Sequence, residues 1–118
     1  MALSKDDILG ADDLPTKTVH VPQWGGDVRI KTLNGSEREE LERLINEFKT
    51  RGKLPGGKAV RAVAVAMSAV DDDSVRLFSN AEIPELAKKS GAALDLLLDE
   101  ILALNGMTKE AAAELEGN

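Results

Sequence analysis

Residues 17–33 alternate apolar and polar side chains, and this alternation constrains the fold more than any other feature of the sequence. Valine or isoleucine occupies every second position over 19–21 and again over 28–30. A period of two is typical of half-buried β-strands. Gly25 and Gly26 lie between the two halves and supply the positive φ angles of a tight connection. The segment therefore predicts a β-hairpin.

A lone hairpin is marginal in water, so it has to pack on helices or pair with a third strand. The segment over 75–78 is the candidate for that third strand. The clearest helix covers 36–51, where Ser36 and Glu39 form a capping box at its start. Its apolar stripe follows helical spacing and consists of Leu41, Leu44, Ile45 and Phe48.

Four further segments complete the predicted architecture. Residues 58–70 suit a buried helix or a strand, and their alanine content favours the helix. Short helices are expected over 83–89 and 109–116, on either side of a leucine-rich helix over 92–104 that ends at Asn105-Gly106. The predicted fold is α+β and mostly helical, with a small antiparallel hairpin, or a three-stranded sheet, packed on four or five helices.

A chain of 118 residues is expected to form one domain. Residues 1–16 combine four aspartates with few apolar residues and end near Pro15, which indicates a flexible acidic arm. Residues 17–118 then form a single globular domain. No apolar run approaches the ~18–20 residues that span a bilayer, so we expect no membrane association.

The sequence offers little for catalysis, metal binding or nucleic-acid binding. The pattern over 52–58 matches a phosphate-binding loop only in part, since Ala59 stands where Ser or Thr binds magnesium. The chain has no cysteine and one histidine, His20, and the run over 71–73 lacks the spacing of a calcium loop. Glutamates alternate with the lysines and arginines of residues 28–61 and cancel most of the positive electrostatic potential that would attract a nucleic acid. We expect no enzyme activity, no metal, no cofactor and no nucleic acid.

Apolar residues in unexpected places are the better candidates for function. Trp24 lies at the predicted hairpin tip, where it either folds back onto the core or contacts a partner. The helix over 92–104 carries more leucine than one side of a small core needs, and Leu96 projects away from its main arc. The candidate partner-binding residues are Trp24, Leu96, Leu97 and Leu102.

Several short motifs, read in order, resemble the tail assembly chaperones of long-tailed bacteriophages and prophages over about residues 17–107. One departure is Asp73-Ser74, where that family is expected to have Asp-Gly in a turn. The motifs are Val21-Pro22-Gln23-Trp24-Gly25-Gly26-Asp27-Val28, Lys31-Thr32-Leu33-Asn34-Gly35-Ser36-Glu37-Arg38, Ala62-Val63-Ala64-Val65-Ala66-Met67-Ser68-Ala69-Val70-Asp71-Asp72-Asp73, Arg76-Leu77-Phe78, Lys89-Ser90-Gly91-Ala92-Ala93-Leu94 and Ile101-Leu102-Ala103-Leu104-Asn105-Gly106.

The resemblance implies a non-enzymatic role in the cytoplasm of the bacterial host. Such chaperones bind the tape measure protein, keep it soluble, help to recruit tail tube subunits and leave before the virion is complete. Many members also exist in an extended form made by ribosomal frameshifting. Separately from the resemblance, exposure of Leu96 and part of the leucine arc to solvent would favour self-association into a homo-oligomer.

Two other functions fit the sequence. One is a permanent structural component of a phage neck or tail, such as a connector, which would remain in purified particles. The other is a small regulator that binds nucleic acid through residues 29–61, which would bind DNA in a salt-dependent manner.

Overall fold

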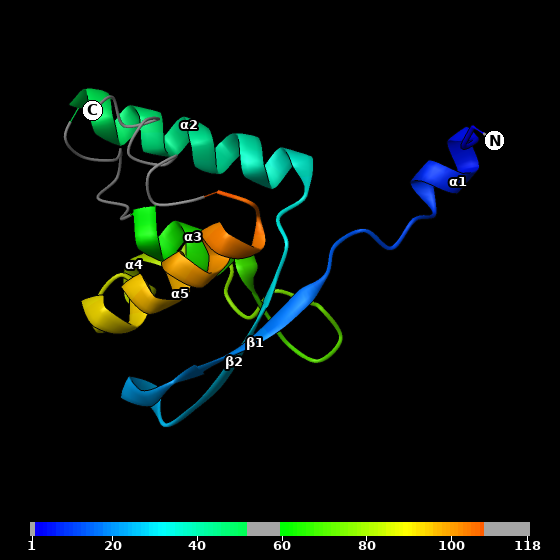
Figure 1. Ribbon diagram of the computed structural model, residues 1–118. Helices are drawn as coiled ribbons and strands as arrows, with labels where there is room; N and C mark the ends of the chain where they lie inside the picture. The colour runs from blue at the N-terminus through cyan, green and yellow to red at the C-terminus, as the bar shows by residue number, and fades with distance from the viewer. Residues whose placement is uncertain (1, 52–59, 108–118) are drawn as a thin grey trace.

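The computed structural model describes residues 2–51 and 60–107, and within them the predicted hairpin is confirmed (Figure 1). Strand β1 (Thr16–Val21) pairs antiparallel with β2 (Gly26–Lys31), and Val19 lies opposite Val28. A 3₁₀ turn, η1 (Pro22–Trp24), connects them and ends at Gly25, whose φ of +66° is the left-handed conformation expected of glycine.

The sheet has three strands, but the third is not the predicted one. Strand β3 (Ala69–Val70) pairs antiparallel with β2 and gives the order β1-β2-β3. The expectation of a strand over 75–78 was wrong, because that segment only turns back beside β3 and makes one bridge, from Arg76 to Val70. The strand β3 directly follows helix α3 (Val60–Ser68), so residues 60–70 form a helix that ends in a strand.

The turn after β3 explains the Asp73-Ser74 departure. The Asp71 carboxylate accepts hydrogen bonds from the backbone N–H groups of Asp73, at 2.8 Å, and Val75, at 3.0 Å. This closes the turn with Ser74 at a φ of +63°, and among the described residues Ser74 is the single non-glycine residue with a positive φ. The turn therefore requires a left-handed backbone at position 74, a conformation that glycine adopts readily, although the residue there is serine.

Ser74→Gly is expected to stabilise the protein by about 0.5–1 kcal/mol. Left-handed backbone costs a residue with a Cβ roughly 1–2 kcal/mol, and the greater freedom of glycine in the unfolded chain offsets part of this gain. Urea denaturation followed by circular dichroism measures the difference. Ser74→Ala is the control, since it keeps the Cβ and should not stabilise. A Ser74→Gly variant less stable than wild type would contradict this account.

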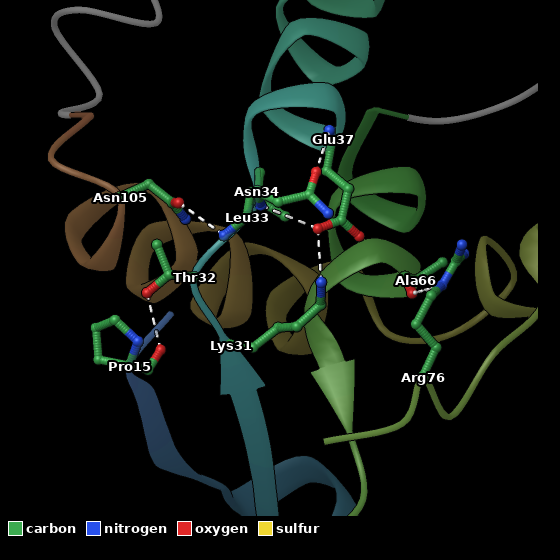
Figure 2. Close-up of polar contacts among 9 residues, drawn as sticks. All are labelled: Pro15, Lys31, Thr32, Leu33, Asn34, Glu37, Ala66, Arg76 and Asn105. Carbon is green, nitrogen blue, oxygen red and sulfur yellow. Dashed lines mark hydrogen bonds and ion pairs between the residues drawn. The ribbon is translucent and has the colours of Figure 1, made fainter. Parts of the chain in front are cut away.

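Helix α2 (Gly35–Arg51) confirms the prediction over 36–51, but its cap lies two residues earlier than expected (Figure 2). Asn34 accepts the N–H of Glu37 at 2.9 Å, and the Glu37 carboxylate accepts the N–H of Asn34 at 3.0 Å. That carboxylate also pairs with Lys31 at the end of β2. The tertiary contact to Lys31 therefore favours the Asn34 box over the Ser36 box.

The apolar stripe of α2 is buried except at its last member. Leu41, Leu44 and Ile45 belong to the core, whereas Phe48 is 40% exposed. On the outer side of α2, hydrogen bonds and ion pairs to Glu40 and Glu47 raise the pKa of Arg43. The helix thus has one core face and one charged face, as its sequence predicts.

The core is centred on helix α3, which contacts α2, α4 and α5 (Figure 1). Its alanines and valines over 62–66 are all buried, and the small side chains allow neighbouring helices to approach closely. Helix α4 (Ile83–Leu86) follows a 3₁₀ turn, η3 (Asn80–Glu82), and helix α5 (Gly91–Leu104) packs on α3 and β1. The predicted helix over 92–104 is confirmed, and the one over 83–89 is shorter than expected.

A buried asparagine joins the end of α5 to the linker between β2 and α2 (Figure 2). The Asn105 side chain accepts the N–H of Leu33 at 2.9 Å and donates to the carbonyl of Ile101 at 2.8 Å. Its backbone carbonyl accepts from Arg38. One residue therefore satisfies polar groups at the end of α5 and in the segment over 33–38, more than sixty residues away in sequence.

The N-terminal segment contains a short helix, α1 (Lys5–Leu9), that stands away from the other elements (Figure 1). It has no buried residue and is capped by Ser4 and Asp7. The Ser4 backbone N–H, helped by the Ser4 hydroxyl, lowers the pKa of Asp7.

The flexibility of residues 1–16 and their separation from a domain over 17–118 stay predictions. The predicted helix over 109–116 and the phosphate-loop pattern over 52–58 lie outside the described residues.

Among residues 2–51 and 60–107, no helix combines the length and the apolar character that crossing a bilayer would require.

Candidate partner-binding groove

An open groove of about 330 Å³ lies between the tip of the hairpin and α4. Trp24 enters it from η1, and Phe78 and Leu86 form the rest of its apolar surface. Leu86 is buried and Phe78 packs against the core, whereas Trp24 is 37% exposed. The tryptophan ring therefore forms an accessible wall of a groove whose other apolar walls are fixed by the core.

Local sequence fixes both sides of this groove. On the hairpin side, Pro22 at the first position of η1 and the left-handed Gly25 hold the turn that carries Trp24. On the helix side, Ser79 and Glu82 form a capping box, in which the Glu82 carboxylate accepts the Ser79 N–H at 2.8 Å. Pro84 then lies in the first turn of α4, where its missing N–H costs little.

The charged rim of the groove is mixed, with two acidic residues and one basic residue. Glu82 and Glu85 line it together with Lys89. Glu85 contacts Lys88 at 3.5 Å, but both side chains are largely exposed, so this pair contributes little. An apolar floor with carboxylates at its edge suits an apolar side chain that has a basic neighbour.

Of the candidate residues predicted from sequence, the structure places only Trp24 at this groove. Leu97 and Leu102 are 0% and 3% exposed and belong to the buried core, so in this structure they offer no surface to a partner. Leu96 is half-buried and packs against the core cluster. Helix α5 contacts α3, β1 and η1, so it is covered on more of its circumference than a helix that packs against the core along one face only. A partner contact at these leucines stays a prediction.

The other groove residues were not predicted as a site. Phe78 and Leu86 look like ordinary core residues in the sequence, and only the tertiary fold brings them to Trp24. One signal was available, since Ser79 and Glu82 have the spacing of a capping box. That spacing identifies the start of the helical segment beside the groove, but not the groove itself.

A second pocket, of about 340 Å³ and more polar, lies at the other end of β1. It is formed by the segment before β1, by the outer face of the sheet and by the turn that contains Ser74. Its lining residues are Asp12, Leu14, Pro15, Thr16, Arg29 and Ser74.

The structure assembles no group of residues typical of a metal site in the part of the chain that it describes. His20 faces Asp27 across the hairpin, with Nδ1 2.9 Å from the carboxylate, and both side chains are exposed. Residues 2–51 and 60–107 contain no cluster of three or more histidine, aspartate or glutamate side chains suited to an ion.

Comparison with known proteins identifies the fold. No family model matches the chain, and no curated protein sequence matches it significantly. Among solved structures, the fold is similar to that of a phage tail assembly chaperone. That protein is the tail assembly chaperone of bacteriophage HK97, with a TM-score of 0.60 and 21% sequence identity over 82% of this chain and 88% of the HK97 chain. The α+β fold predicted from the sequence patterns is confirmed.

Proposed function

We propose that this chain is a non-enzymatic tail assembly chaperone of a long-tailed bacteriophage or prophage. It binds the tape measure protein in the host cytoplasm, keeps it soluble, helps to recruit tail tube subunits and is absent from the mature virion. The observation that carries this proposal is the fold shared with the HK97 tail assembly chaperone over most of both chains. The ordered sequence motifs over 17–107 support it independently of that comparison.

The groove at Trp24 is the proposed client-binding surface. A client with amphipathic helices presents apolar side chains every three or four residues, and such a helix suits an apolar groove. Trp24, Phe78 and Leu86 supply the apolar contact, and Glu82 and Glu85 favour a client segment with lysine or arginine beside its apolar anchor. Tryptophan is also among the residue types that most often contribute a large share of the binding energy at protein interfaces.

Co-expression with the tape measure protein of the same phage tests the proposal. The two proteins are expected to co-purify, and Trp24→Ser should weaken the complex about 10–30-fold, as for the loss of an interface hot spot. Leu77→Ser is the matched control, since Leu77 is an exposed apolar residue outside the groove lining. Failure to form a complex, or recovery of the chain in purified virions, would contradict the chaperone role and favour a permanent neck or tail component.

A further inference from the structure

We propose that Arg29, in the second pocket, is the anchor of a binding site for a carboxylate carried by a protein segment. Arg29 lies on β2, between Thr18 of β1 and Val70 of β3 in the register of the sheet. Its side chain is half-buried, and its Nε atom is buried without a hydrogen-bond partner among the described residues. This site is separate from the Trp24 groove and does not depend on the proposed function.

The other arginines with described side chains all have partners, which makes Arg29 the exception. Arg38 and Arg43 pair with glutamates on α2, Arg61 pairs with Asp95, and Arg76 donates to the carbonyl of Ala66. A buried N–H without an acceptor lowers the stability of the folded state. Arg29 therefore keeps a donor available at the expense of stability, as expected of a residue that binds something.

The pocket around Arg29 has the size and chemistry for a carboxylate. Its volume of about 340 Å³ is many times the roughly 30 Å³ that a water molecule takes in the liquid. Thr16 and Ser74 add hydroxyl groups to the lining, and Leu14 and Pro15 add an apolar wall. A planar guanidinium binds a planar carboxylate through two parallel hydrogen bonds.

A carboxylate fits better than a phosphate because of the charges nearby. Asp12 also lines the pocket, and within the described ranges it makes no ion pair with Arg29. The Asp12 carboxylate repels a doubly charged phosphate more strongly than a singly charged carboxylate, and the single Arg29 guanidinium neutralises one negative charge but not two. The carboxylate has two sources, the acidic segment of this chain that includes Asp12 and Asp13, or an acidic side chain of a partner protein.

Nuclear magnetic resonance of the full chain tests the site through the Nε–Hε signal of Arg29. The probe is an acetylated, amidated Gly-Glu-Gly peptide, with Gly-Gln-Gly and inorganic phosphate as comparisons. The glutamate peptide should shift the Arg29 signal saturably at about millimolar concentration. The signal of Arg61, which already donates to Asp95, is the internal control and should not move. Phosphate that shifts the Arg29 signal as strongly as the glutamate peptide would overturn the assignment to a carboxylate.

Variants separate the outcomes. Arg29→Lys keeps the charge but loses the paired donors, and should weaken peptide binding at least tenfold, whereas Arg29→Met should abolish binding and leave the melting temperature equal or higher. A shift in wild type identifies a partner carboxylate as the ligand. A shift seen only after Asp12→Asn and Asp13→Asn identifies the chain's own segment as the occupant. No saturable shift in either protein would overturn the proposal, as would a large loss of stability in Arg29→Met.

Discussion

Replacing Asn105 with alanine is expected to lower the free energy of unfolding by about 2–3 kcal/mol. The Asn105 side chain is the acceptor for the buried N–H of Leu33 and a donor to the carbonyl of Ile101. Alanine would leave the buried Leu33 N–H without its acceptor, whereas the Ile101 carbonyl would keep the backbone N–H of residue 105, at 3.1 Å. The desolvation penalty of the Leu33 N–H would then apply in full. Urea denaturation monitored by circular dichroism measures the loss.

The matched control for this prediction is Asn80→Ala. Asn80 also accepts a side-chain hydrogen bond, from Arg76 at 3.0 Å, but it lies on the surface where water replaces the lost partner. It should therefore cost about 0.5 kcal/mol or less. If the two variants lost equal stability, the bond between Asn105 and Leu33 would not be what holds the linker to the end of α5.

Leu97→Ala is expected to cost about 3 kcal/mol, the typical effect of removing a fully buried leucine side chain. Leu97 has no exposed surface and lies on α5, where that helix meets the rest of the core. Its truncation leaves a cavity that the surrounding helices can fill only in part. Thermal and urea denaturation of the purified variant measure this loss.

The adjacent residue provides the control. Leu96 is half-buried, so Leu96→Ala should cost about 1 kcal/mol. A loss at Leu96 as large as that at Leu97 would mean that α5 is enclosed on all sides and that none of its leucines can contact a partner. The converse result, a small loss at both, would mean that Leu97 is not in the core.

The spacing of apolar residues along the sequence predicted most of the helices and strands. The alternation over 17–33 gave the hairpin, and the stripe that includes Leu41 and Ile45 gave α2, because one face of each element must be buried. The cap of α2 could not be chosen in the same way. Asn34 with Glu37 and Ser36 with Glu39 both have capping-box spacing, and the contact of Glu37 with Lys31 comes from the tertiary fold.

Features that depend on contacts between distant segments were missed. The third strand is two residues at the end of α3, too short for any alternation to indicate it. The surplus of leucine over 92–104 predicts an exposed apolar surface, whereas α5 contacts both α3 and β1 and uses much of that surplus in the core. Period alone does not reveal how many neighbours a helix has.

The groove was predictable only through one residue. Trp24 stood out because a tryptophan at a turn needs either a core or a partner. Phe78 and Leu86 come from segments more than fifty residues further along the chain, and no spacing rule connects them to Trp24. Their meeting depends on η1 lying against α5 and on the position of α4, which the sequence patterns do not specify.

The central claim, that the Trp24 groove binds an apolar segment of the tape measure protein, is tested most directly by fluorescence. The chain contains one tryptophan and no tyrosine, so its emission reports on Trp24 alone. Titration with a tryptophan-free fragment of the tape measure protein is expected to shift the emission saturably to shorter wavelength, because the bound segment removes the ring from water. A complex that forms by size-exclusion chromatography while the emission of Trp24 stays unchanged would contradict the claim.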